Sequence, residues 1–240
     1  MFAKYFSLIA LLGLFTSCAT RYILPGNRFM TPETQGEVLR GQFEIQQGSA
    51  NILSINTKNS SVEDGVLYRD IQRTSYQYSN SLFDPFDIFL AHTGSSNTVF
   101  GGKFQFLGGS RVSKSAGHKA SFSAGIGENK HTTENKAVKF NLRAQENFLI
   151  YGYRFSEFVM PYGNVSYSKY RFDGKISHSN PSLNGTRPGY ETIIVAGSVG
   201  VELSYAALVS KLECTYQQLD TNKTKEHNRF IFGYSLGVAW

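Results

Sequence analysis

The last residues of the chain alternate between two kinds of side chain. From Phe230 to Trp240, every even position is large and apolar or aromatic, whereas the odd positions after Ile231 are small. A repeat of two residues predicts a β-strand with one apolar face and one face of small side chains. A surface strand of a soluble protein would instead place charged groups opposite its apolar face. The run also matches the ~9–11 residues that a tilted strand needs to cross a bilayer.

The same alternation recurs in segments further upstream. Apolar side chains at every second position face more polar or smaller ones in 39–45, 100–106, 120–126, 138–144, 193–203 and 208–216. An apolar outside and a polar inside are typical of a β-barrel in lipid, because a closed ring of strands satisfies every backbone group without water. The sequence therefore predicts an all-β fold, an antiparallel transmembrane β-barrel over residues 36–240. We expect an even strand number and favour ten strands, with eight as the alternative because the pattern is weakest over 47–80.

One segment departs from this alternation. The apolar positions of 138–144 are even-numbered, but those from Leu149 to Phe155 are odd-numbered. One extra residue in a strand reverses the face that each later side chain takes. We therefore expect a β-bulge near 145–148.

Polar connections of two lengths separate the expected strands. Long polar runs occur at 128–136, 178–189 and 220–228, and short ones at 156–160 and 204–207. Outer-membrane barrels alternate long external loops with short periplasmic turns in this way. We therefore expect the long runs on the external side and Trp240 at the periplasmic rim.

The amino-terminal residues have the features of a signal peptide over 1–17. Lys4 precedes an apolar run, 5–15, that is too short to span a bilayer but has the length of a signal-peptide core. The small residues before Cys18 resemble a bacterial lipobox, in which the cysteine is diacylated and becomes the new amino terminus. This resemblance implies a lipid anchor at Cys18. Ordinary cleavage after Ala19 is the alternative, and it would discard Cys18.

The sequence predicts different roles for the two ends of the mature chain. Residues 18–35 are polar and are expected to form a periplasmic lead, with the amino terminus on the periplasmic side. The aromatic carboxyl end resembles the signal by which the barrel-assembly machinery recognises bacterial outer-membrane barrels. The residues that match this signal are Phe232, Tyr234, Leu236, Val238 and Trp240. The resemblance implies a place in the bacterial outer membrane, with that machinery, outer-membrane lipids and lipopolysaccharide as partners.

Composition excludes several other classes of protein. A hydrophobic share of 41% and a mean hydropathy of −0.26 exclude a helical membrane protein with several long spans. A 14% aromatic share excludes a disordered chain. The net charge of +6 is dispersed, so we expect no nucleic-acid partner. The histidines are scattered and nucleotide-binding fingerprints are absent, so we expect no metal and no cofactor; Cys214 is expected to be inert.

The same parities predict which charged side chains face the lumen. They are Arg40, Glu44, Lys103, Lys119, Lys139, Arg143, Glu202, Lys211 and Glu213. A barrel of this size has little interior space, and buried charges need partners. We therefore expect a filled lumen in which Lys211 or Arg143 pairs with Glu202 or Glu213. If a pore exists, the basic excess predicts anion preference.

Three functions remain open. The leading hypothesis is a non-enzymatic outer-membrane barrel with a structural or small-solute pore role. His178, Ser179 and Glu191 resemble the His/Ser/Glu triad of outer-membrane lipid A 3-O-deacylases, which implies a lipid-modifying enzyme as the alternative. However, adjacent residues on a strand point in opposite directions, which favours a solvated turn at Asn180 instead. A soluble periplasmic barrel lipoprotein that binds a small apolar ligand is the second alternative.

Overall fold

The computed structural model describes residues 21–54, 56–58, 61–63, 71–93, 98–132, 138–176, 189–221 and 224–240. The expected signal peptide and Cys18 lie outside these residues. Across the described part of the chain, none of the helices is long and apolar enough to cross a membrane.

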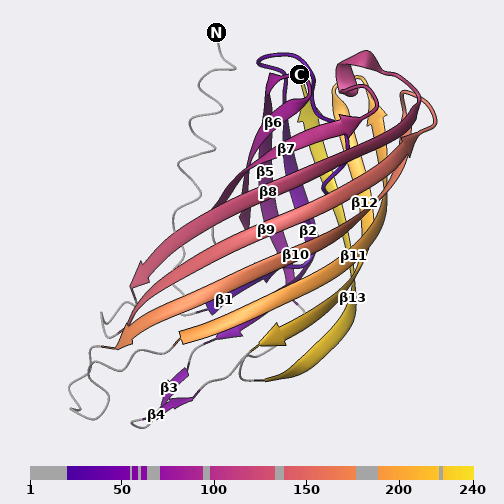
Figure 1. Cartoon of the computed structure of the whole chain (residues 1–240). Helices are drawn as coiled ribbons and strands as arrows, with labels where there is room; N and C mark the ends of the chain where they lie inside the picture. The colour runs from indigo at the N-terminus through magenta and orange to yellow at the C-terminus, as the bar shows by residue number, and fades with distance from the viewer. Residues whose placement is uncertain are drawn as a thin grey trace.

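Ten antiparallel strands form a closed ring (Figure 1). They are β2 (Gly41–Ser54), β5 (Ile71–Phe83), β6 (Phe86–Thr93), β7 (Thr98–Leu107), β8 (Gly117–Thr132), β9 (Val138–Arg154), β10 (Val159–Ile176), β11 (Gly189–Tyr205), β12 (Leu208–Thr221) and β13 (Thr224–Ala239). Each strand pairs with its neighbour in sequence, and β2 pairs with both β5 and β13, which closes the ring. The predicted ten-stranded barrel is confirmed.

The closing seam between β2 and β13 is short. It joins seven residue pairs, from Gly233 with Gly48 to Ala239 with Gln42, whereas β9 and β10 share fifteen. Beyond Gly48 the short strand β1 (Arg21–Pro25) takes the place of β13 beside β2. Ala50 accordingly pairs with Ile71 of β5 on one side and with Pro25 of β1 on the other.

The two ends of the barrel differ. The carboxyl end of the chain lies at the upper end in Figure 1, where the backbone N–H of Gly41 donates to the carbonyl of Trp240 at 3.2 Å. Short turns, and a connection with a short 3-10 helix, η1 (Arg111–Ser113), lie at this end. The hairpin of β3 (Asn56–Lys58) and β4 (Ser61–Glu63) lies at the lower end.

Two expected external loops are shorter than predicted. β12 reaches Thr221 and β13 begins at Thr224, so most of the run 220–228 is strand; β8 continues to Thr132. Backbone ladders do not depend on side-chain polarity, so strands continue beyond the apolar segment of the wall. Polarity marked the end of that segment rather than the end of the strands.

The expected bulge near 145–148 is wrong. β9 pairs continuously with β8 and β10 from Val138 to its far end. Leu142 and Ala144 are buried and face inward, while Arg143 faces outward like Leu149. The inward residues of this part of β9 pack in an apolar cluster inside the barrel, which explains why their polarity suggested the opposite face.

The outer wall is covered by exposed apolar side chains. Representative members are Phe104, Phe122, Leu149, Val165, Val199, Leu212, Phe232 and Leu236. Their neighbours in sequence point inward and include the fully buried Ser121, Ser123 and Thr215. The barrel is therefore apolar outside and largely polar within.

Candidate functional site: a filled barrel lumen

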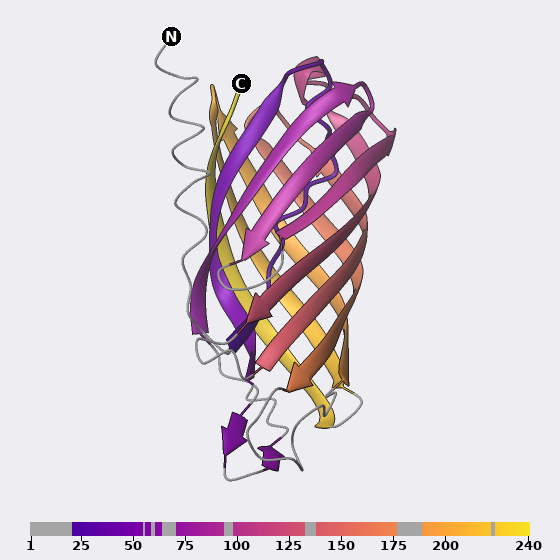
Figure 2. The same ribbon diagram turned by 90° about the vertical axis from the view of Figure 1, so that its left-hand side faces the viewer.

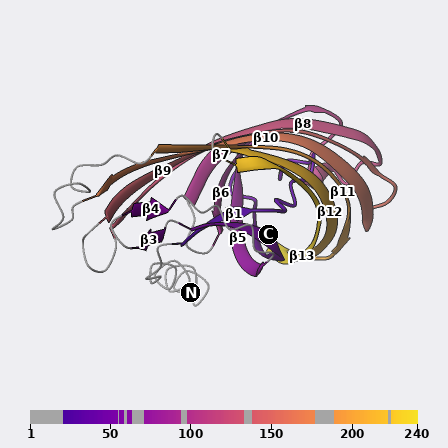
Figure 3. The same ribbon diagram turned by 90° about the horizontal axis from the view of Figure 1, so that it is seen from below.

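An amino-terminal stretch of the chain occupies the interior of the barrel. After β1 the chain bends at Gly26 and runs along the lumen as residues 27–35, called the lumen segment below. Figure 2 shows this indigo trace between the strands, and Figure 3 shows it inside the ring. All nine residues are buried. The described part of the expected periplasmic lead, 18–35, therefore lies in or beside the barrel, because its polar side chains complement a polar interior.

Gly26 is required where the chain enters. A Cβ atom at this position would lie 2.1 Å from the carbonyl oxygen of Ser49 and 2.8 Å from the side chain of Ile231. The first of these distances falls on backbone, which cannot move aside locally. Only glycine therefore allows the chain to pass between β2 and β13 into the lumen.

The first residues of the lumen segment, Asn27 and Arg28, are held by an ion pair and hydrogen bonds. Arg28 forms an ion pair with Glu146, which also accepts a hydrogen bond from the hydroxyl of Tyr170 at 2.6 Å. The Asn27 amide donates to Thr215 Oγ1 at 2.8 Å. These contacts tie the segment to β9 and β12.

Near the middle of the lumen, one lysine contacts both the segment and the wall. The Nζ of Lys211 donates to the carbonyl of Phe29 at 3.0 Å and forms an ion pair with Glu44. Glu213 accepts a hydrogen bond from the hydroxyl of Tyr162 at 3.1 Å. Each of these charged groups is buried with a partner, as a low-dielectric interior requires.

Glu33 is the centre of a buried chain of charges. Its carboxylate accepts hydrogen bonds from Arg154 Nε at 2.7 Å and Nη2 at 2.5 Å, and Lys119 Nζ lies 3.5 Å away. Arg154 also donates to Glu202 at 2.9 Å, and Glu202 accepts from Arg111 at 2.7 Å. The Glu33 and Lys119 side chains are 0% exposed. Positive and negative groups thus alternate through the half of the lumen nearer Trp240.

The last residues of the lumen segment bind the wall through backbone groups. The N–H of Gln35 donates to Asp87 Oδ2 at 3.0 Å, and the N–H of Thr34 donates to Gln105 Oε1 at 2.7 Å. Lys103 lies 3.7 Å from the Asp87 carboxylate. Because a backbone donor is fixed in direction, these bonds set the register of the segment in the barrel.

The half of the lumen nearer β1 also contains an apolar cluster. Leu24 and Met30, on either side of the entry point, belong to it. The wall contributes Phe89, Ala91, Val99, Leu142, Ala144, Phe148, Ile150, Tyr170, Phe172, Ile194 and Leu219. The segment is therefore packed as well as paired, and the cluster accounts for the inward apolar side chains of β9.

Six of the charged residues predicted to face the lumen are buried there. They are Glu44, Lys103, Lys119, Glu202, Lys211 and Glu213. The expected pairing differs, because Lys211 pairs with Glu44, and Glu202 pairs with Arg154 and Arg111.

Three of the predicted lumen charges are outside, which corrects the prediction. Arg40 lies in the turn before β2, where its side chain is 50% exposed and lies 3.2 Å from Glu37. Lys139 is exposed. Arg143 is on the outer face, 3.5 Å from Glu128. Lys139 and Arg143 were assigned to the lumen because the sequence pattern of this part of β9 suggested the opposite inward face.

Residues of the lumen segment that hold it in place were not foreseen. Arg28 and Glu33 gave no sequence signal, because they lie in a stretch without periodicity. Glu146 and Arg154 do lie on the inward parity of β9, once its second half is extended through the whole strand.

The proposed catalytic residues are only partly described. Glu191 lies on the outer face of β11, 2.8 Å from Lys169 Nζ. His178 and Ser179 lie outside the described residues. Among the residues that are described, no cluster of three or more histidine, cysteine, aspartate or glutamate side chains could hold a metal ion.

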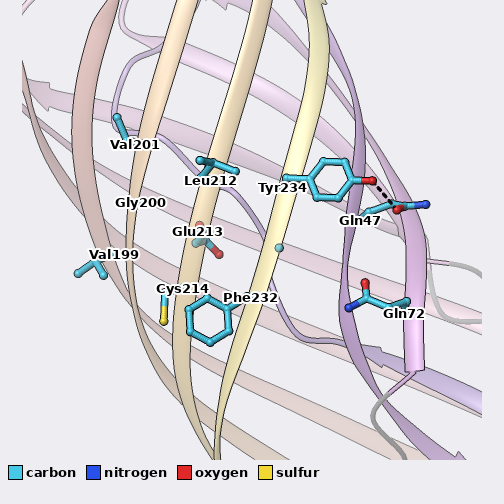
Figure 4. Close-up of a pocket in the computed structure, with 11 residues that line it drawn as sticks. Gln47, Gln72, Val199, Gly200, Val201, Leu212, Glu213, Cys214, Phe232 and Tyr234 are labelled. Atoms are coloured by element: carbon cyan, nitrogen blue, oxygen red, sulfur yellow. Dashed lines mark hydrogen bonds between the residues drawn. The ribbon is translucent and has the colours of Figure 1, made fainter.

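Cys214 and Phe232 line a groove on the outer wall (Figure 4). They pair across β12 and β13, and Cys214 is a free thiol. At one side of the groove, the Tyr234 hydroxyl donates to Gln47 Oε1 at 2.7 Å. The groove has a volume of about 840 Å³ and its outward side chains are mostly apolar. It lies on the wall and is separate from the lumen segment.

The residues of the carboxyl-terminal pattern all point outward from β13 or its end. Phe232, Tyr234, Leu236, Val238 and Trp240 are each exposed. The Trp240 ring lies 6.0 Å from that of Tyr78, and the Trp240 backbone pairs with Gly41. They form one continuous apolar row on the outer wall.

Comparisons with known proteins concern the fold. Neither a protein-family model nor a curated protein sequence matches the chain. It is similar to the solved structure of Ail, the attachment invasion locus protein of Yersinia pestis, in complex with the heparin analogue sucrose octasulfate (9% identity, 85% of this chain and 98% of that chain, TM-score 0.42). It is also similar to Neisserial surface protein A (12%, 84% and 95%, 0.36) and to the outer membrane channel DcaP of Acinetobacter baumannii (8%, 94% and 99%, 0.25). By its own strand pairing, the chain is a closed ten-stranded antiparallel β-barrel.

Proposed function

We propose that this protein is a non-enzymatic outer-membrane barrel with a structural role, closed by its own amino-terminal segment and acylated at Cys18. Its partners are outer-membrane lipids, lipopolysaccharide and the barrel-assembly machinery. The carboxyl end lies at the periplasmic rim. The lumen segment closes the barrel, so solutes do not pass through the lumen of the folded protein.

The burial of the lumen segment is the observation that carries the proposal. Arg28 and Glu33 are almost fully buried, and each is paired with charged groups of the wall. A segment held this way fills the space that a pore would need. The alternative of a barrel binding a small apolar ligand needs an empty apolar interior, whereas the chain itself occupies this one.

The outer wall favours insertion in a membrane over a soluble barrel. The row from Phe230 to Trp240 exposes large apolar or aromatic side chains at every second position, and β12 adds Leu208, Leu212 and Tyr216 beside it. Apolar patches of this extent are rare on soluble monomers. Aromatic residues at the end of such a row fit the level of the lipid headgroups.

Two measurements on the wild-type protein test the proposal. After membrane fractionation, we expect the protein in the outer membrane, with different gel migration before and after boiling. In planar bilayers we expect no steady conductance. A single gel band from a soluble fraction would exclude the transmembrane barrel, and steady conductance would exclude the closed lumen.

Leu236→Lys is expected to impair insertion of the barrel. Leu236 lies near the middle of the apolar row on β13 and is 59% exposed. A lysine at mid-membrane costs about 2–4 kcal/mol in such barrels, and about 0–1 kcal/mol near the interface. Tyr205→Lys, at the end of β11, is therefore the matched control. Urea unfolding in liposomes measures both, and equal losses would contradict the membrane assignment.

Cys18→Ser is expected to abolish acylation without preventing insertion. The apolar wall binds a membrane far more strongly than one or two acyl chains do. Mass spectrometry of the mature amino terminus measures the first effect, and the gel shift on boiling measures the second. An unmodified wild-type chain that begins after Ala19 would show that Cys18 is removed by ordinary cleavage.

A further inference from the structure

β1 fixes the end of the barrel at which the chain enters the lumen. Its residues pair antiparallel with the far end of β2, from Arg21 with Ser54 to Pro25 with Ala50. The opposite end of β2, at Gly41, is bound to the backbone of Trp240. The first described residue and the last one therefore lie at opposite ends of the barrel (Figure 1).

The contacts of the lumen segment follow the same direction without reversal. Arg28 reaches Thr93 and Glu146, towards the end where β1 lies. Glu33 reaches Arg154, the last residue of β9, and the Gln35 side chain donates to Gln42 at 2.9 Å, beside the Trp240 end. The chain thus crosses the whole barrel once between Pro25 and Gly36.

We propose that the mature amino terminus is displayed on the cell surface, and that the chain runs inward through its own barrel. The inference rests on the proposed function, because it takes the Trp240 end as periplasmic. It replaces the sequence-based expectation of a periplasmic amino terminus.

The position of Cys18 gives this topology a chemical consequence. Cys18 precedes Arg21 by three positions, and an extended chain spans up to about 3.5 Å per residue, so Cys18 can lie no further than about 10 Å from Arg21. Arg21 pairs with the outermost residue of β2. Acyl chains on Cys18 would therefore enter the outer, lipopolysaccharide-containing leaflet rather than the periplasmic one.

Buried ion pairs keep the segment in this direction. Removing one partner of a buried pair leaves an uncompensated charge in a low-dielectric site. Withdrawal of the segment would leave Glu146, Arg154 and Lys119 without Arg28 or Glu33. The direction is thus a stable property of the folded protein rather than one of two exchanging states.

A peptide epitope placed at three positions of the full chain tests the topology. The first variant carries it between Thr20 and Arg21. The second carries it within 177–188, between the ends of β10 and β11 on the side of Arg21, and the third in the turn between Ala206 and Ala207. Antibody binding is measured on intact and on permeabilised cells. The gel shift on boiling establishes that each variant is folded.

The inference expects equal labelling of the first and second variants in intact and permeabilised cells, with the third labelled only after permeabilisation. Labelling of the second variant but not the first on intact cells would overturn the inference and leave the proposed function standing. Labelling of the third but not the second on intact cells would instead overturn the proposed orientation of the barrel.

Discussion

Replacing Glu33 with alanine is expected to lower the free energy of unfolding by about 3–5 kcal/mol. The carboxylate accepts two hydrogen bonds from Arg154 and lies 3.5 Å from Lys119, whose side chain is 0% exposed. Without Glu33, Lys119 loses the carboxylate that its ion pair requires, while Arg154 keeps Glu202. Urea titration of the barrel in liposomes, before and after the substitution, measures the loss.

Glu37→Ala is the matched control for this effect. Glu37 lies four residues further along the chain and also pairs with an arginine, Arg40, but its side chain is 58% exposed. Exposed pairs contribute about 0–1 kcal/mol. If both substitutions cost the same, Glu33 is not held in a buried charge network and the lumen segment does not lie as described.

Replacing the lumen segment with a Gly/Ser linker of equal length is expected to turn a closed barrel into a conducting one. The linker keeps β1 and the turn before β2, but it removes the packing of Met30 and the ion pairs of Arg28 and Glu33. Flexible Gly/Ser chains behave as random coils, so they leave the lumen open to water. Planar-bilayer recording should change from no steady conductance to steady steps.

The same recordings test ion selectivity. Among the described residues, the inner wall and η1 carry six basic side chains, Lys103, Arg111, Lys119, Arg154, Lys211 and Arg229, against five acidic ones, Glu44, Asp87, Glu146, Glu202 and Glu213. We therefore expect weak selectivity. The anion preference expected from the sequence is therefore reduced, because Arg40, Lys139 and Arg143 lie outside the lumen.

A double substitution at the rim, Glu37→Ala with Arg40→Ala, controls for changes at the mouth of the barrel nearer Trp240. It removes an exposed ion pair and leaves the lumen segment in place. This variant should remain closed. A linker variant that folds, by its gel shift on boiling, and still does not conduct would show that other residues close the barrel.

The wall of the barrel could be predicted from the sequence because its physics is local. On β13, lipid contact selects an apolar side chain at every second position, so the alternation from Phe230 to Trp240 identifies both the strand and its outward face. The lumen positions of Lys211 and Glu213 follow from the same two-residue repeat on β12. Ring closure then fixes an even number of strands.

The half of β9 nearer β1 did not reveal which face of the strand is lipid-facing. In this half the inward side chains are apolar and an outward one is charged, the reverse of the usual pattern. Inside the lumen, Leu142 meets an apolar cluster; outside, Arg143 pairs with Glu128. A repeat of two residues gives the alternation, but it does not say which side is lipid. The half of β9 nearer Trp240, from Leu149 onward, has apolar side chains on its lipid-facing side and therefore indicates the correct face.

The lumen segment was invisible to sequence patterns for a different reason. Arg28 and Glu33 have partners more than a hundred residues away, on β9, and form no regular element that would impose a period. A polar stretch that fills a polar cavity has the same composition as one in water. Only the assembled ring distinguishes them.

The short seam between β2 and β13 bears on the order of events during assembly. The lumen segment precedes β2 in the chain and lies inside the ring, which seven residue pairs between β2 and β13 close. β1 pairs with β2 beyond the last of these pairs. If the ring closed first, the free end of the chain would have to be drawn through an interior that side chains already fill. We therefore expect β2 and β13 to pair only after the lumen segment is in place. Formation of the seam is then the last step of folding, and the wall closes around the lumen segment.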